Sequence, residues 1–239
     1  MFSMEERLLL EYFGSDPEKL LNARARLAAH EPLAYILGET VFFDETYKVT
    51  PAVLIPRPDT ERVVEKVLAH LPAGGELLDL CTGSGCIAIS SLCHSKNTRA
   101  LLVDISENAL EIAKENAQSN GVLKRCSFEQ RDLMKGLPEG RFDVIVSNPP
   151  YVQSTVVDTL EKECSFEPRI AFDGGLDGGD FYRKILDEAR AHLKEGGRIV
   201  FEIGYDQRSL MEELCGARGF GLEIYKDYGK NDRVAVITP

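Results

Sequence analysis

Four consecutive residues, Asn148-Pro149-Pro150-Tyr151, directly follow a run of apolar residues, 142–147, that predicts a buried strand. Proline donates no backbone hydrogen bond and restricts the residue before it, so the strand must end here and the chain stiffens. In open α/β sheets, ligands bind outside the carboxyl ends of the strands. The motif therefore either forms a rigid binding element or is only a proline-rich turn.

Three aspartates lie at the ends of three other predicted strands: Asp79 in 76–80, Asp104 in 100–105 and Asp132 in 128–132. The carboxyl ends of parallel strands meet at one edge of a sheet, so we expect these carboxylates to face one crevice. Carboxylates there suit a cofactor that carries a sulfonium and an ammonium group. The pattern suits S-adenosylmethionine, with Asp79 near its amino group, Asp104 on the ribose hydroxyls and Asp132 near the adenine. The alternative is that each of these acids only caps a helix or lies in a solvated loop.

A glycine-rich turn, Cys81-Thr82-Gly83-Ser84-Gly85, follows the first of these strands. Its glycines permit positive φ and close approach to a ligand. Residues 83–88 also match G-x-G-x-x-A, so on these residues alone a nicotinamide dehydrogenase remains open. Turn and strand ends together give the candidate cofactor-binding residues, which are Asp79, Thr82, Gly83, Ser84, Gly85, Asp104, Ile105, Asp132, Leu133 and Asn148.

Beside such a methyl donor, the Asn-Pro-Pro-Tyr motif suits methylation of a planar NH₂ group. The lone pair of an amide nitrogen is delocalised, so its two N–H groups must be held with the lone pair facing the methyl carbon. The Asn148 side-chain oxygen and the Pro149 carbonyl are fixed acceptors that also stabilise the positive charge developing on nitrogen. Tyr151 offers a face for stacking. We expect residues 148–151 to be catalytic, and Asn148, Pro149, Tyr151 and Arg57 to contact the substrate.

The elements that must position these residues alternate between strand and helix from residue 74 onward. Further strands are expected at 198–203, 222–225 and 233–237, with helices at 86–92, 107–119, 179–194 and 207–216. This alternation predicts a doubly wound, mostly parallel α/β sheet. Only residues 226–232 join the last two strands, so we expect them to pair antiparallel. Residues 151–178 show no strong periodicity.

The chain before residue 58 has a different pattern. Residues 1–39 are expected to be helical, with Asp16 as an N-cap, Pro17 at a first helical position and Gly38 ending a short helix. Residues 41–43 and 47–49 predict a hairpin around a turn at 44–46. Arg57 then lies between two prolines on a rigid loop, and Asp59 or Thr60 can cap a helix to about residue 71. We therefore divide the chain into a short helical region (1–39), a hairpin linker (40–57) and an α/β domain (58–239) that carries the candidate site.

Composition narrows the class of protein. The 239 residues carry a formal net charge of −11 without a basic stripe, which weighs against a nucleic-acid substrate and favours a cationic cofactor or a basic protein partner. Six scattered cysteines and four histidines have no ligand spacing, so we expect reduced thiols and no metal. The first residues are acidic and no apolar run approaches ~20 residues, so we expect neither an export signal nor a membrane span.

Several motifs resemble the PrmC/HemK family of protein-(glutamine-N5) methyltransferases. Beyond the glycine turn and Asn-Pro-Pro-Tyr, which many amino-methyltransferases share, the similar segments are 31–38 (EPLAYILG), 54–61 (LIPRPDTE) and 177–182 (DGGDFY). The resemblance implies a class I S-adenosylmethionine-dependent methyltransferase fold, Rossmann-like, with seven strands and a C-terminal antiparallel strand. It also implies a helical N-terminal region that helps to grip the partner.

The resemblance implies that the substrate is the glutamine of the Gly-Gly-Gln motif in class 1 peptide-chain release factors, methylated in the cytoplasm by a monomeric enzyme that binds no nucleic acid directly. This sequence departs from the family in Cys81, where glycine is usual, in Asp59, where glutamate is usual, and in a shorter N-terminal helical region. Three alternatives remain: a glutamine methyltransferase for a ribosomal protein, an N6-adenine methyltransferase for DNA or RNA, and a non-catalytic cofactor-binding module.

Overall fold

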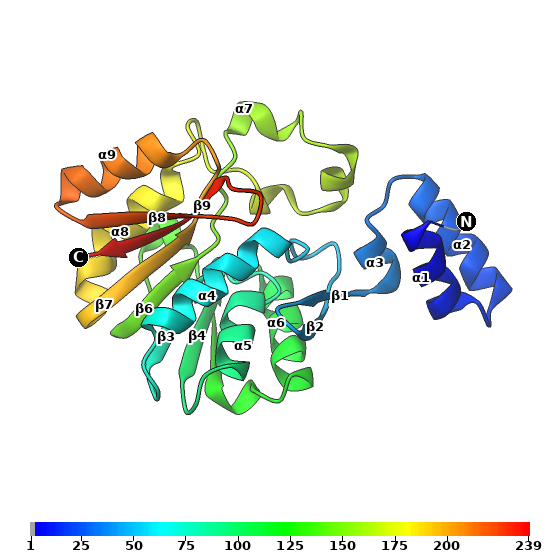
Figure 1. The fold of residues 1–239 in the computed structure, drawn as a ribbon, viewed down its shortest axis with the longest axis horizontal. Helices are drawn as coiled ribbons and strands as arrows, with labels where there is room; N and C mark the ends of the chain where they lie inside the picture. The colour runs from blue at the N-terminus through cyan, green and yellow to red at the C-terminus, as the bar shows by residue number, and fades with distance from the viewer. Residues whose placement is uncertain (1–2) are drawn as a thin grey trace.

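The computed structural model describes residues 3–239, so the first two residues of the predicted helical region 1–39 lie outside it. Its main feature is a seven-stranded sheet in the order β5-β4-β3-β6-β7-β9-β8 (Figure 1). The strands are β3 (Glu76–Leu80), β4 (Arg99–Asp104), β5 (Cys126–Gln130), β6 (Phe142–Ser147), β7 (Leu193–Glu202), β8 (Gly221–Lys226) and β9 (Asp232–Thr238). β9 pairs antiparallel with both β7 and β8, whereas the other pairs are parallel. The predicted fold class and closing hairpin are confirmed.

Helices cover both faces of this sheet. They are α4 (Glu61–His70), α5 (Cys86–Cys93), α6 (Glu107–Ser119), α8 (Asp180–His192) and α9 (Arg208–Arg218). In β3, Leu77 packs into the core formed with α4, α5 and α6, whereas Leu78 and Leu80 pack into the core formed with α8 and α9. Successive side chains of a strand point to opposite faces, and here both faces are buried. This explains why the central strands read as continuous apolar runs.

The N-terminal helices α1 (Met4–Phe13), α2 (Pro17–Ala28) and α3 (Leu33–Leu37) have a small core of their own, formed by Leu9, Leu20, Ala23 and Ile36. Asp16 accepts a hydrogen bond from the backbone N of Lys19 at 3.1 Å, and Pro17 begins α2. Gly38 ends α3 with φ +83°. The capping residues predicted for this region are confirmed.

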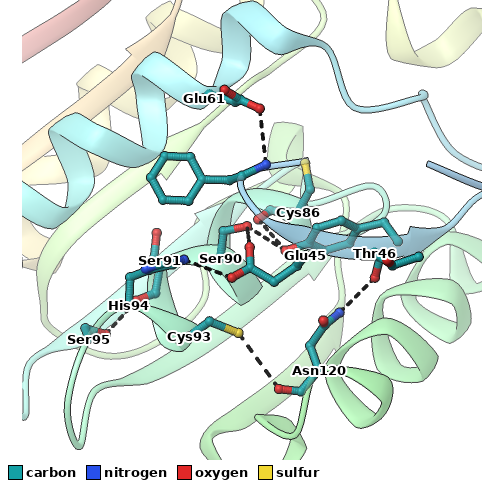
Figure 2. A network of polar contacts seen from close by, with 12 residues as sticks. Glu45, Thr46, Glu61, Cys86, Ser90, Ser91, Cys93, His94, Ser95 and Asn120 are labelled. Atoms are coloured by element: carbon teal, nitrogen blue, oxygen red, sulfur yellow. Dashed lines mark hydrogen bonds and ion pairs between the residues drawn. The ribbon is translucent and has the colours of Figure 1, made fainter. Parts of the chain in front are cut away.

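The hairpin consists of β1 (Glu39–Phe42) and β2 (Glu45–Lys48). Its turn is Phe43-Asp44, with φ of +50° and +78°, so the predicted turn at 44–46 was wrong. A two-residue loop with two positive φ angles matches the twist of the flanking strands. Figure 2 shows how the hairpin is fixed to α5: the two carboxylate oxygens of Glu45 lie 2.7 Å from Ser90 Oγ and 2.9 Å from His94 Nε2.

Other boundaries also differ from prediction. β5 ends at Gln130, so Asp132 lies two residues beyond it and caps a 3₁₀ turn by accepting from the Met134 backbone N at 3.0 Å. β7 begins at Leu193, five residues early, where its register against β6 is irregular. Residues 58–60 form a 3₁₀ helix before α4, and neither Asp59 nor Thr60 caps α4 with its side chain.

Residues 151–178 contain only α7 (Ser154–Val157) and two 3₁₀ turns, Lys162–Phe166 and Arg169–Ala171. The described helices include none that is long and apolar enough to cross a membrane.

Candidate active site

A pocket lies at the carboxyl ends of β3, β4 and β6. It brings together many of the residues predicted for the site, which are Arg57, Thr82, Gly83, Ser84, Asp104, Ile105, Asp132, Leu133, Asn148 and Pro150. Four predicted residues do not line it: Asp79, Gly85, Pro149 and Tyr151. The strand ends and the glycine turn thus form one cavity, as their shared sheet edge requires.

The glycine turn is built from backbone conformations that most residues avoid. Cys81, Gly83 and Gly85 have φ of +57°, +54° and +81°. At Gly83 an added Cβ would meet nothing within 4 Å, so glycine is favoured there by the positive φ and not by a lack of space. At Gly85 an added Cβ would also lie 2.8 Å from the side chain of Ile89, so this glycine permits close packing of α5 rather than ligand contact.

Asp104 fixes this turn to the end of β4. Its Oδ2 accepts a hydrogen bond from the Gly83 backbone N and its Oδ1 accepts one from the Ser106 backbone N, each at 2.9 Å. Burial raises the pKa of the Asp104 carboxyl, and these backbone donors oppose that shift. The carboxylate is therefore held at the pocket wall with lone pairs left for hydroxyl donors.

Asp79 lies beneath the turn rather than in the pocket wall, because β3 continues one residue beyond it. Its side chain is 1% exposed, and Oδ2 accepts from Thr82 Oγ1 at 2.7 Å and from the Ala88 backbone N at 3.3 Å. Among the described residues, Oδ1 has no hydrogen-bond partner. Burial raises the pKa of Asp79 to about 7. A buried oxygen of this kind is costly unless a donor reaches it.

Hydrogen bonds fix the Asn-Pro-Pro-Tyr motif at both ends, one from the residue before it and one from its last residue. Ser147 Oγ donates to the Leu80 carbonyl at 2.7 Å, which fixes the end of β6 beside the glycine turn. Tyr151 points away from the pocket and donates its hydroxyl to Glu202 Oε1 at 3.1 Å. Phe181 supplies an aromatic wall of the pocket instead. Sequence reasoning missed this role, although Phe181 lies in one of the motifs that carry the resemblance.

Arg57 joins its rigid loop to the segment 151–178. Its guanidinium pairs with Glu167, whose side chain is 1% exposed and also accepts from the Ile55 backbone N at 2.9 Å. Pro168 and Ile170 beside this ion pair line the pocket. The segment therefore forms a wall of the site, which its weak periodicity did not reveal. Glu167 was missed for the same reason, since only its long-range partners make it informative.

Within residues 3–239, no group of three or more His, Cys, Asp or Glu side chains is arranged to hold a metal ion. Cys81 lines the pocket as a free thiol, and burial raises its pKa well above the usual range. A thiol protonated in this way is a poor nucleophile, so the chemistry of the site falls to the amide, the carboxylates and the backbone carbonyls.

Comparison with known proteins identifies the family to which this chain belongs. Residues 60–163 match the family model "Methyltransferase small domain". The chain is 40% identical to the release factor glutamine methyltransferase of Geobacter sulfurreducens over 86% of this chain and 73% of that protein. For the Caulobacter vibrioides protein of the same name, the identity is 37% over 98% of this chain and 88% of that protein. A methyltransferase structure from Pyrococcus furiosus superposes with a TM-score of 0.61 at 22% identity, covering 90% of this chain and 96% of that one, which shows the shared fold. Together with the motifs and the pocket, these similarities show that the chain belongs to the family of release factor glutamine methyltransferases.

Proposed function

We propose that this protein transfers a methyl group from S-adenosylmethionine to the side-chain amide nitrogen of the glutamine in the Gly-Gly-Gln motif of class 1 release factors. The observation that carries the proposal is the position of Asn148, which shares one pocket with Asp104 and the glycine turn. An acceptor for an NH₂ group thus lies beside a site suited to a cationic methyl donor. The names of the relatives supply the identity of the partner.

The donor set of the pocket fits this cofactor. We infer that Asp104 accepts the ribose hydroxyls and that Asp132 lies near the adenine, while Ile105 and Leu133 line the same pocket. Asp79 lies beneath the glycine turn and, among the described residues, has one oxygen, Oδ1, without a hydrogen-bond partner. We infer that this oxygen interacts with the ammonium group of the cofactor across the turn. When bound, the cofactor supplies an electrophilic methyl group, and these carboxylates favour its positive charge.

The chain's own contribution to the reaction is orientation. Pro149 itself does not line the pocket, but its carbonyl is bonded to Pro150, which does. We infer that Asn148 Oδ1 and this Pro149 carbonyl accept the two N–H groups of the glutamine amide and turn its lone pair toward the methyl group. The same oxygens stabilise the positive charge that develops on nitrogen. No histidine is found among the described residues that line the pocket, and none is required. A methylated, positively charged amide is a strong acid, so its proton is lost without a dedicated base.

Labelled S-adenosylmethionine tests this proposal. The purified enzyme should transfer label to a class 1 release factor, and no label should appear on the same factor with alanine in place of the Gly-Gly-Gln glutamine. Equal labelling of both factors would refute the proposed acceptor. Label on a ribosomal protein or on a nucleic acid, with none on the release factor, would favour the corresponding alternative.

We further propose that residues 1–39 help to hold the release factor, that 40–57 link this region to the catalytic domain 58–239, and that the enzyme acts as a monomer in the cytoplasm. The separate core of the three N-terminal helices supports the first boundary.

A further inference from the structure

Tyr151 is held at both its side chain and its backbone by the end of β7 and the turn that follows. Its hydroxyl donates to Glu202 Oε1 at 3.1 Å, and its carbonyl accepts from Gln207 Nε2 at 2.9 Å. Gln207 is fixed in turn, because its Oε1 accepts from the Gly204 backbone N at 2.9 Å. Tyr151, the last residue of the Asn-Pro-Pro-Tyr motif, therefore anchors the three residues before it.

The carboxylate of Glu202 holds a second segment as well. This residue is 3% exposed, and its Oε2 accepts a hydrogen bond from Thr60 Oγ1 at 2.6 Å. Thr60 ends the loop that carries Arg57, and both residues line the pocket. Each oxygen of one buried carboxylate is thus bonded to a different side of the site, Thr60 on the loop before α4 and Tyr151 on the motif after β6.

The charge of Glu202 is partly compensated within the fold. Burial raises the pKa of its carboxyl, while the hydrogen bond from Thr60 and the positive charge of Arg233 lower it. Arg233 is itself held by Asp227, 3.2 Å from its Nε, and by the Ile203 carbonyl, 3.3 Å from its Nη1. Two hydroxyl donors and a nearby guanidinium hold this buried carboxylate in one position.

We propose that Glu202 is a positioning residue for methyl transfer, which fixes the separation of Asn148 from the Arg57 loop by binding Tyr151 and Thr60 at once. The inference rests on the proposed function, since it concerns where the acceptor amide is held. Glu202 lines no part of the pocket, so it acts only through its two partners. A displacement of ~1 Å in such a clamp costs ~100-fold in rate, because methyl transfer requires in-line geometry.

Two substitutions of Glu202 separate positioning from charge. Glutamine retains an acceptor for Thr60 and a donor for the Tyr151 oxygen, whereas methionine of similar length retains neither. We expect kcat of Glu202→Gln to stay within about fivefold of the native enzyme and kcat of Glu202→Met to fall about 30-fold or more. The Kd for S-adenosylhomocysteine should change less than about threefold in both. Native kcat in Glu202→Met, or equal losses in both variants, would overturn the proposal.

A double-mutant cycle tests the path through Tyr151. Tyr151→Phe removes the same hydrogen bond from its other side, so the losses of kcat in Glu202→Met and Tyr151→Phe should be clearly less than multiplicative when combined. Fully multiplicative losses would contradict a shared bond. If Glu202→Met fails to fold, Tyr151→Phe and Thr60→Val test the two bonds singly, and native kcat in both would overturn the proposal.

Asp143→Asn is the matched control. Asp143 lies at the opposite end of β6, where its carboxylate also bridges two elements by accepting from the Glu76 backbone N and from Lys194 Nζ, each at 2.7 Å. This variant should lose stability without losing kcat. The native enzyme's activity on the release factor is measured first, so its absence would count against the proposed function, whereas altered ratios among variants bear only on Glu202.

Discussion

Asp79 combines burial, a raised pKa of about 7 and one unpartnered oxygen. The ordinary pKa of its carboxyl is 3.8, so the folded chain retains a proton that the unfolded chain loses between about pH 4 and about pH 7. The contribution of this group to the free energy of unfolding therefore falls as pH rises through that range. The ionised carboxylate of Asp79 is stabilised only when a cation or a hydrogen-bond donor reaches its unpartnered oxygen.

This ionisation predicts a pH-dependent affinity for the cofactor. An ammonium group stabilises ionised Asp79, so the Kd for S-adenosylhomocysteine should fall about tenfold as pH rises from about 6 to about 8. Calorimetry at several pH values measures this dependence, and proton release should accompany binding at the lower pH. Asp79→Asn should flatten the profile. A native profile that is already flat would show that the ligand does not reach Asp79.

Asn148 carries the acceptor that the proposed clamp requires. Asn148→Ala should lower kcat by about 10²- to 10³-fold, the usual cost of losing one such electrostatic contact, and should change the Kd for S-adenosylhomocysteine less than about threefold. Turnover with a release factor and calorimetry measure the two quantities. Asn120→Ala is the control, because Asn120 lies outside the pocket and donates to the Thr46 carbonyl at 3.0 Å. Similar kcat in the two variants would remove Asn148 from the mechanism.

Cys81 is a non-glycine residue in a left-handed conformation, with φ +57°. A Cβ in this conformation costs about 1 kcal/mol. Cys81→Gly and Cys81→Ala both lose the thiol, but only glycine relieves the backbone. Urea denaturation should therefore show Cys81→Gly more stable than Cys81→Ala by about 1 kcal/mol. Equal stabilities would mean that the turn is not strained at this residue.

At the scale of elements, residues 172–178 fold back against the last two residues of the motif and the residue that follows it. The Val152 backbone N donates to the Phe172 carbonyl and the Gly174 backbone N donates to the Val152 carbonyl, each at 2.8 Å. A Cβ at Gly174 would lie 2.6 Å from the Pro150 carbonyl oxygen, and one at Gly178 would lie 2.2 Å from the Tyr151 carbonyl oxygen. Glycine is required at these positions because two backbones meet there.

Two glycines with nearly equal φ separate this packing effect from backbone strain. Gly178 and Gly196 have φ of +75° and +76°, but a Cβ at Gly196 would meet nothing within 4 Å. Both Gly→Ala variants should lose about 1 kcal/mol of stability from the conformation. Gly178→Ala should lose about 1–3 kcal/mol more and should also lose kcat, because Tyr151 must shift. Chemical denaturation and turnover measure both effects, and matching results for the pair would refute close packing at Gly178.

Local patterns predicted most of these elements. The helix expected after the N-cap Asp16 begins at Pro17, the helix expected at 107–119 has these bounds, and the apolar runs became the central strands. The features that were mispredicted depend on partners distant in the sequence. Thr60 was expected to cap α4, but its hydroxyl is bonded to Glu202, and β7 begins early because it pairs with the start of β6 at Phe142. Such contacts leave no periodic signal in the chain.

The site could likewise be predicted where it depends on local patterns, but not where it depends on residues distant in the sequence. Asp104, Asp132 and Asn148 were identifiable because strand ends meet at one sheet edge, and the structure brings them into one pocket. The direction of Tyr151 was not identifiable, since it depends on Glu202 at the end of β7. The role of Phe181 was missed because the fold alone places α8 beside the pocket.

At the scale of the whole molecule, the N-terminal helices extend from one side of the catalytic domain, and the hairpin lies between them and that domain (Figure 1). The helices have a small core of their own, whereas Phe42 and Tyr47 of the hairpin are buried in the core of the catalytic domain. The net charge of −11 favours basic partners over nucleic acid, which carries its own negative charge. The architecture therefore agrees with a protein substrate whose glutamine is presented to an internal pocket.

Tandem mass spectrometry of a class 1 release factor, incubated with this protein with and without S-adenosylmethionine, tests the central claim most directly. We predict one added methyl group on the side-chain amide of the Gly-Gly-Gln glutamine, dependent on the cofactor and lost with the Asn148→Ala enzyme. An unmodified glutamine, with a methyl group found on another residue or on another macromolecule, would contradict the account.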